Sequence, residues 1–275
     1  MTINCKGKLI DLSTPKVMGV LNLTPDSFYD GGKYKNKKSI LLRVEKMLNE
    51  GATFIDVGAY SSRPGAIHIS EDEEKKRIVN IVVSIIEKFP ESILSIDTFR
   101  SNIALECLQA GATIINDITA SEYDENILKV ASKFKAPYIM MHMRGMPSNM
   151  LNKIDYNNLL KEMIFYFSKK IQLAKKYQLN DIIIDPGFGF SKNIDQNYEL
   201  LKNLNLFKNI GLPILVGLSR KSMIYKLLKI TPSEALNGTS VLNTIALNNG
   251  ASILRVHDIK EAVECIKIMN EINKQ

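Results

Sequence analysis

Two aspartates stand at the ends of short apolar runs, Asp97 at one run and Asp185 at another. Two carboxylates that face one site suit acid–base chemistry or the recognition of a planar N–H edge. Asn116 ends a third run and adds an amide, which both donates and accepts hydrogen bonds. Together the three side chains match a heterocycle with an amino-pyrimidinone edge. The alternative for Asp97 is that it caps a helix starting near Thr98, an interaction worth about 1 kcal/mol.

Basic side chains follow the last two apolar runs. Lys221 lies in a basic turn after the seventh run, and Arg255 and His257 close the eighth. Strand alternation places Arg255 and His257 on one face, and such a pair beside the start of a helix is typical of an anion site. An inward Lys221 would bind a ring carbonyl or an anion, and the alternative is a solvated turn that leads into a helix. No G-x-S-x-G motif offers a serine nucleophile.

One unit of helix, turn and strand recurs along the chain. Gly51, Gly111 and Gly250 are each followed by Ala, a small hydroxyl residue, two apolar residues and a polar residue. Each glycine follows a stretch in which apolar residues recur at helical spacing, which is where a helix C′ glycine belongs. The pattern predicts a helix, a tight turn and a buried strand that delivers a polar residue at its carboxyl end.

Eight short apolar runs indicate eight such strands, at residues 17–21, 54–57, 93–96, 113–115, 138–141, 182–184, 214–216 and 253–256. Continuous apolar runs are typical of parallel strands buried on both faces. Eight β/α units in about 250 residues specify an α/β fold of the (β/α)8 TIM barrel type, with its active site at the carboxyl ends of the strands. An open doubly wound sheet is the alternative. We expect a single domain over residues 1–275, with a short N-terminal hairpin in residues 1–13 across the bottom of the barrel.

Composition narrows the classes of function. The chain has 275 residues, is 45% hydrophobic and carries a net charge of +7. Its lysines are scattered and no aromatic–basic motif interleaves them, which favours a solvated basic surface over nucleic-acid binding. No apolar run approaches the roughly 18–20 residues of a membrane span, and the N-terminal residues lack a signal-peptide pattern. Three distant cysteines without a C-x-x-C pair favour a reducing, cytoplasmic location.

Eight segments, in order along the chain, resemble motifs of the dihydropteroate synthases. They are residues 22–28, 61–66, 95–98, 115–117, 141–145, 185–190, 217–222 and 255–258; the first reads Asn-Leu-Thr-Pro-Asp-Ser-Phe and the second Ser-Ser-Arg-Pro-Gly-Ala. Each motif alone is modestly specific, but eight in family order are highly specific. The resemblance runs over residues 17–268, nearly the whole chain.

The resemblance implies an enzyme of folate biosynthesis that condenses 6-hydroxymethyl-7,8-dihydropterin diphosphate with para-aminobenzoate, releasing 7,8-dihydropteroate and pyrophosphate. It implies catalytic roles for Asn22, Arg63, Lys221, Arg255 and His257, with Arg255 and a protonated His257 stabilising the departing diphosphate. It implies pterin contacts from Ser62, Asp97, Asn116, Met141, Asp185, Lys221 and Arg255. The para-aminobenzoate pocket, where sulfonamides compete in this family, would be framed by Phe28, Ser62, Arg63, Pro64, Phe190, Lys221 and Ser222.

The same resemblance implies Mg²⁺ as cofactor with Asn22 as a ligand, and a homodimer packed through helices late in the barrel order. The expected partners are the two small-molecule substrates, with neither nucleic acid nor membrane. One position departs from the family pattern, because Tyr60 stands where the family often has an acid. A methyltetrahydrofolate methyl-transfer barrel is an alternative that would lack the loops at 22–28 and 61–66. A non-catalytic pterin-binding protein is another, and it would not need the diphosphate-binding residues.

Overall fold

The structure, a computed structural model, describes residues 1–24, 37–61 and 68–274. Eight parallel strands form its main sheet in the order β8-β7-β6-β5-β4-β3-β10-β9. The strands are β3 (Lys16–Asn22), β4 (Phe54–Gly58), β5 (Ile93–Asp97), β6 (Ile114–Asp117), β7 (Tyr138–Met141), β8 (Ile182–Asp185), β9 (Leu215–Val216) and β10 (Ile253–Val256). A parallel bridge between Ile184 and Ile214 brings the two ends of the sheet together. The predicted barrel is confirmed, and the open doubly wound sheet was the wrong alternative.

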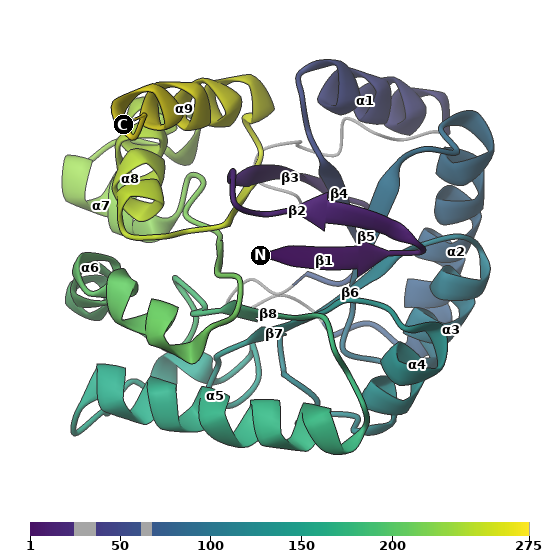
Figure 1. Ribbon diagram of the computed structural model, residues 1–275, viewed down its shortest axis with the longest axis horizontal. Helices are drawn as coiled ribbons and strands as arrows, with labels where there is room; N and C mark the ends of the chain where they lie inside the picture. Colours follow the sequence, from purple (N-terminus) through teal and green to yellow (C-terminus); the bar gives the residue numbers. More distant parts are fainter. Residues whose placement is uncertain (25–36, 62–67, 275) are drawn as a thin grey trace.

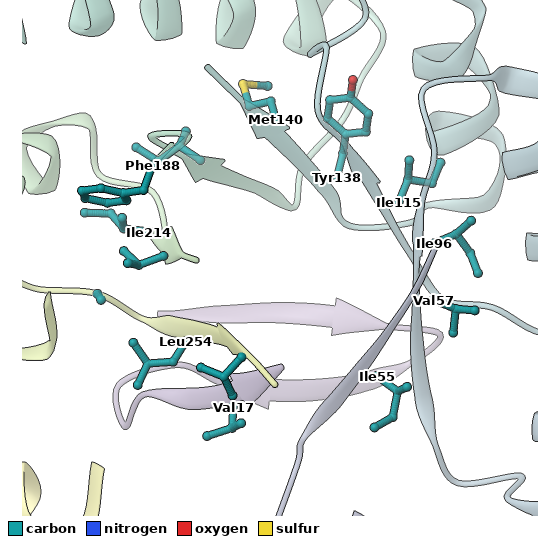
Figure 2. Packing of buried hydrophobic residues seen from close by; sticks show 14 of the residues in the cluster. Val17, Ile55, Val57, Ile96, Ile115, Tyr138, Met140, Phe188, Ile214 and Leu254 are labelled. Atoms are coloured by element: carbon teal, nitrogen blue, oxygen red, sulfur yellow. The ribbon is translucent and has the colours of Figure 1, made fainter. Parts of the chain in front are cut away.

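Helices in the described residues form a ring around the sheet (Figure 1). They are α1 (Lys37–Asn49), α2 (Glu71–Lys88), α3 (Ser101–Gln109), α4 (Asn126–Phe134), α5 (Leu159–Lys176), α6 (Ile194–Lys202), α7 (Ser222–Leu228), α8 (Leu236–Asn248) and α9 (Ile259–Ile272). Their apolar faces and the outward side chains of the strands form the main core. Figure 2 shows part of this layer, with the register partners Val57, Ile96 and Ile115 on neighbouring strands. Burial on both faces explains why the strands read as continuous apolar runs.

The recurring glycines end helices in the left-handed backbone conformation. Gly51 follows α1 with φ +101°, Gly111 follows α3 with φ +117°, and Gly250 follows α8 with φ +100°. Residues with a Cβ rarely adopt these φ values, which is why glycine recurs at the same step of each unit. The predicted helix–turn–strand unit is confirmed at all three positions.

A hairpin covers the amino-terminal end of the barrel. Strands β1 (Thr2–Cys5) and β2 (Lys8–Asp11) pair antiparallel and are seen across the middle of the ring in Figure 1. Their side chains Ile3, Cys5 and Ile10 pack on the inward apolar residues nearest the strand starts, namely Met18, Phe54, Ile93, Ile114, Ile139, Ile183, Leu215 and Ile253. The predicted hairpin is confirmed. Because it covers the amino-terminal end, an active site must lie at the carboxyl end of the barrel.

One further expectation is decided by the fold. Helix α3 begins at Ser101, whose N–H donates to Asp124 Oδ2 at 2.8 Å, so the alternative that Asp97 caps this helix is wrong. In the described ranges, no helix combines the length and apolar character needed to span a bilayer.

Candidate active site

Polar side chains fill the carboxyl end of the barrel interior. Alternate residues of each strand point inward, and the apolar layer over the hairpin is followed by a layer of ionisable and amide groups. This layer holds Asp56 from β4, Asp97 from β5, Asn116 from β6, Asp185 from β8 and Arg255 from β10. The parallel topology therefore brings together at one end of the barrel residues that are far apart in the sequence.

Arg255 is held between two carboxylates. Its Nε and Nη2 atoms lie 2.7 and 2.6 Å from Asp56 Oδ2, and Nη2 also lies 2.7 Å from Asp97 Oδ2. Burial disfavours the cation, but the carboxylates of Asp56 and Asp97 outweigh it and raise the pKa of Arg255. The guanidinium therefore stays charged, and two strands fix its orientation.

Asn116 joins the same cluster from β6. Its Nδ2 donates to Asp56 Oδ2 at 3.1 Å, and the residue is buried. A carboxylate only accepts, so the NH2 group must face Asp56 and the amide oxygen must face away from it. The hydrogen bond to Asp56 therefore fixes the orientation of the Asn116 amide.

Asp185 closes β8 at the start of a tight turn. Its Oδ1 accepts from the Gly187 N–H at 2.8 Å. Gly187 has φ +70°, and a Cβ there would collide with the carbonyl oxygen of His142, so the turn requires glycine. The turn fixes the direction of the Asp185 carboxylate.

Lys221 points into the same space from the loop after β9. Its Nζ donates to the carbonyl oxygen of Phe188 and lies 4.9 Å from the centre of the Phe190 ring. Burial lowers the pKa of Lys221 to about 8, and the Asp185 carboxylate opposes this shift. The inward contacts exclude the alternative of a solvated basic turn.

Burial raises the pKa of both candidate aspartates. The pKa of Asp97 reaches about 7, because burial and then the Asp56 charge outweigh the opposing Arg255 guanidinium. The pKa of Asp185 also rises through burial, with the Lys221 ammonium and the Gly187 N–H opposing the shift. Shifted pKa values on convergent groups are typical of a binding or catalytic site.

Asn22 and His257 lie at the carboxyl ends of β3 and β10, which are neighbours in the sheet. The backbone N–H of His257 donates to Ser219 Oγ at 3.2 Å, and the backbone carbonyl oxygen of His257 accepts from Arg43 Nη2 at 2.8 Å. Burial and then the Arg255 cation lower the pKa of His257 to about 3. Without an anion beside it the ring favours the neutral form, which supplies one N–H donor. The protonated His257 expected beside the diphosphate stays a prediction, because a neighbouring negative charge raises the pKa of an imidazole.

The remaining candidates divide into two groups. Met141 ends β7 in an apolar cluster at the barrel mouth, and the partly buried Phe190 packs against that cluster. Ser222 opens α7 directly after Lys221. The others, Phe28, Ser62, Arg63 and Pro64, lie outside the described residues.

Sequence reasoning assigned no role to two groups that the structure places here. Asp56 orients both Arg255 and Asn116, and its inward position, two residues after the inward Phe54, is the signal that identifies it. Lys192 donates to the carbonyl oxygens of Gly187 and Phe190 at 3.1 and 3.0 Å, and its Nζ lies 3.1 Å from His142 Nδ1. No local pattern marks this tie between the loops after β7 and β8.

Comparisons with known proteins agree with this geometry. The chain matches the family model of pterin binding enzymes over residues 18–257. It is 41% identical to the dihydropteroate synthase of Escherichia coli K12 over 271 residues, which are 98% of this chain and 95% of that protein. It resembles a Yersinia pestis dihydropteroate synthase with a sulfonamide drug at a TM-score of 0.95, 40% identity and 99% of each chain. It resembles the Xanthomonas albilineans dihydropteroate synthase with 4-aminobenzoic acid at a TM-score of 0.91 and 30% identity, over 100% of this chain and 98% of that one.

Proposed function

The chain belongs to the dihydropteroate synthases of the pterin binding enzyme family, and from that premise we propose how its own residues divide the reaction. The enzyme is a transferase that joins a dihydropterin diphosphate to para-aminobenzoate. The observation that carries the assignment of roles is the convergence of Asp97, Asn116, Asp185 and Lys221 on one barrel mouth.

The pterin ring is bound by complementary donors and acceptors. Asp97 and Asp185 accept from the amino and ring N–H groups, Asn116 pairs through its amide, and the Lys221 ammonium donates to the ring carbonyl. Arg255 and Met141 pack along the ring, and Ser62 adds a contact. Because these polar groups are buried or half-buried, an analogue that lacks one ring N–H or carbonyl leaves a protein group unpaired and is rejected strongly.

The diphosphate lies at the ends of β3 and β10. Arg255, His257, Asn22 and Arg63 bind it, and His257 donates through a ring N–H. In the described residues, no group of three His, Cys, Asp or Glu side chains could hold a metal by itself. A single Asn22 amide oxygen nevertheless fits Mg²⁺, which typically takes one or two protein ligands and completes its shell with substrate phosphates and water. When bound, Mg²⁺ would neutralise charge on the departing diphosphate.

The reaction is a dissociative displacement. The C–O bond to the diphosphate breaks, its electron pair leaves with the diphosphate, and positive charge develops on the pterin methylene. The para-aminobenzoate nitrogen then donates its lone pair to form the C–N bond and loses a proton. Asp97 and Asp185 offset the cation while Arg255 stabilises the leaving anion, so positioned charges replace a protein nucleophile. Para-aminobenzoate is framed by Phe28, Ser62, Arg63, Pro64, Phe190, Lys221 and Ser222.

Pyrophosphate release tests the function directly. Purified protein with Mg²⁺ and the dihydropterin diphosphate should release pyrophosphate only when para-aminobenzoate is present. Release without para-aminobenzoate would indicate hydrolysis, and pterin binding without turnover would indicate a binding protein. Either result would overturn the assignment.

Pterin affinity should have two pH limits. Asp97, with a pKa of about 7, must be ionised to accept, so affinity falls as pH drops below that value. Lys221, with a pKa of about 8, must be protonated to donate, so affinity also falls as pH rises above that value. Calorimetric titration of a dihydropterin across pH measures both limbs. A constant Kd between about pH 6 and 9 would contradict the assigned roles.

We also propose a homodimer formed through the last helices. Apolar residues of α7, α8 and α9 are exposed although large, namely Leu227, Leu228, Val241, Ile245, Ile268 and Ile272. An exposed apolar patch over neighbouring helices is typical of an interface. Ile245→Glu should convert a dimer to a monomer in analytical ultracentrifugation, since a charge would be buried without a partner. Phe165→Glu on α5, which is also exposed, is the control and should leave the mass unchanged.

The remaining proposals concern the chain as a whole. We infer one catalytic domain over residues 1–275 and a cytoplasmic location. The support for the location is that Cys5, Cys107 and Cys265 are all buried free thiols.

A further inference from the structure

Three uncharged groups bind the ammonium of Lys192, a residue that is only 3% exposed. Its Nζ lies 3.1 Å from the Gly187 carbonyl oxygen, 3.0 Å from the Phe190 carbonyl oxygen and 3.1 Å from His142 Nδ1. Burial lowers the pKa of His142 well below its usual range, so its ring is neutral and Nδ1 can accept. An ammonium has three N–H donors and no acceptor, so these three acceptors use all of its hydrogens.

Lys192 bridges the two ends of the turn after β8. The Phe190 N–H donates to the Gly187 carbonyl oxygen at 3.1 Å, and the Lys192 ammonium binds the carbonyl oxygens of both residues. Gly187 and Gly189 have φ +70° and +79°, in the left-handed region that favours glycine. The Gly189 N–H donates to Asn197 Oδ1 at 2.7 Å. Two side chains and two glycines therefore fix the shape of this turn.

Lys221 lies along the same turn. Its Nζ donates to the carbonyl oxygen of Phe188 and lies 4.9 Å from the centre of the Phe190 ring. A Cβ at Gly189 would lie 3.1 Å from Lys221 Cδ, so the Lys221 side chain passes close to the backbone there. The Phe188 ring is fully buried in the main core, where Figure 2 shows it, and anchors the carbonyl. The turn therefore determines where the Lys221 ammonium lies.

Stability alone does not explain a lysine at position 192. Burial lowers the pKa of Lys192 to about 7, although the Asp185 carboxylate opposes this shift, so the buried charge is unfavourable. An apolar residue of similar volume avoids that cost and is often at least as stable. What a group with three donors supplies is a simultaneous bond to both turn carbonyls and to His142 on the neighbouring loop.

We propose that Lys192 is a positioning residue for Lys221. It holds the turn at residues 187–190 in the shape in which the Phe188 carbonyl directs the Lys221 ammonium toward the ring carbonyl of the pterin. This rests on the proposed function, in which Lys221 donates to that ring carbonyl. Lys192 acts through the turn and not through contact with the substrate, because its three ammonium hydrogens are already bound.

A double-mutant cycle on pterin binding tests the proposal. Lys192→Met keeps a long side chain and removes all three donors. Calorimetry at pH 6.5, below the pKa of Lys192, measures the Kd for the dihydropterin diphosphate in the absence of para-aminobenzoate. Lys192→Met should raise this Kd about three- to tenfold, the scale of one hydrogen bond, and Lys221→Met about ten- to 100-fold. In the Lys221→Met background, Lys192→Met should change the Kd less than about threefold, because the group that it positions is gone.

Lys170→Met is the matched control, because Lys170 is also a mostly buried lysine, with a side chain 13% exposed, but its ammonium pairs with Glu122 at 3.1 Å. It should keep the wild-type Kd. If Lys192→Met fails to fold, Lys192→Gln replaces it in the same cycle, since an amide NH2 group serves at most two of the three acceptors.

Two results would overturn the proposal. One is a Kd for the Lys192 variant less than about threefold above wild type, when Lys221→Met does weaken binding. The other is a change of about threefold or more in the Lys221→Met background, which would make Lys192 a general structural support. An unchanged Kd in Lys221→Met would instead contradict the role that the proposed function gives to Lys221.

Discussion

Asp185→Asn should abolish most of the activity while leaving the fold intact. The carboxylate presents one oxygen to the Gly187 N–H at 2.8 Å, and we assign the other to the pterin. An Asn carbonyl would keep the bond to Gly187, so the new NH2 group would face an N–H of the pterin. Losing a charge-assisted hydrogen bond and opposing two donors costs about 2.7 kcal/mol, which is about a 100-fold fall in kcat/KM for the dihydropterin diphosphate.

The control for this variant is the same substitution at Asp181, which lies one residue before β8, at the amino-terminal end of the barrel. Asp181→Asn should leave kcat/KM unchanged. Pyrophosphate release with saturating para-aminobenzoate measures both variants, and circular dichroism checks that both are folded. An Asp185→Asn enzyme within about threefold of wild type would remove Asp185 from the pterin site, since so small a change is under 1 kcal/mol.

The fold could be predicted because its signals are local. A helix, a C′ glycine and an apolar strand lie within about twenty-five residues of each other, so Gly51, Gly111 and Gly250 each mark a unit without any knowledge of distant contacts. The seventh strand was predicted at 214–216 and is observed at Leu215–Val216. Ile214 lies just outside this strand, where it forms an isolated bridge to Ile184 and its carbonyl oxygen accepts from the backbone N–H groups of Ser252 and Ile253.

The residues of the candidate site could be predicted only where they lie at the ends of strands. Asp97 and Asp185 end their strands, Asn116 and Arg255 are next to last in theirs, and parallel topology brings such residues to one rim. Contacts between side chains from separate loops have no such pattern. Lys192 and His142 are 50 residues apart, and their pairing depends on how two loops pack. The lowered pKa of His257 also depends on burial beside Arg255, which a sequence motif does not encode.

Asp56 could be predicted only in part. Its position in strand β4 follows from the local sequence pattern, whereas its hydrogen-bond partners lie on other strands. Its Oδ2 accepts from Arg255 Nε at 2.7 Å and from Asn116 Nδ2 at 3.1 Å. Both partners are residues that we assign to the pterin, so Asp56 orients them without being in the list of expected ligands. Its side chain is fully buried, which means that the carboxylate has no solvent to replace a lost partner.

Asp56→Asn should therefore weaken pterin binding through its neighbours. Arg255 and Asn116 both donate to Oδ2, so the new amide can keep its carbonyl oxygen in that place. It nevertheless loses the negative charge that faces the Arg255 guanidinium, and it buries an NH2 group where Oδ1 has no hydrogen-bond partner among the described residues. We expect the Kd for the dihydropterin to rise about tenfold to 100-fold, the cost of disturbing one to two hydrogen bonds to charged groups. Ser95→Ala is the matched control, because Ser95 is the register partner of Asp56 on β5 and its buried hydroxyl has no hydrogen-bond partner among the described residues. Calorimetry should give Ser95→Ala the wild-type Kd, and a wild-type Kd for Asp56→Asn would show that Arg255 and Asn116 are held by the pterin itself and not by Asp56.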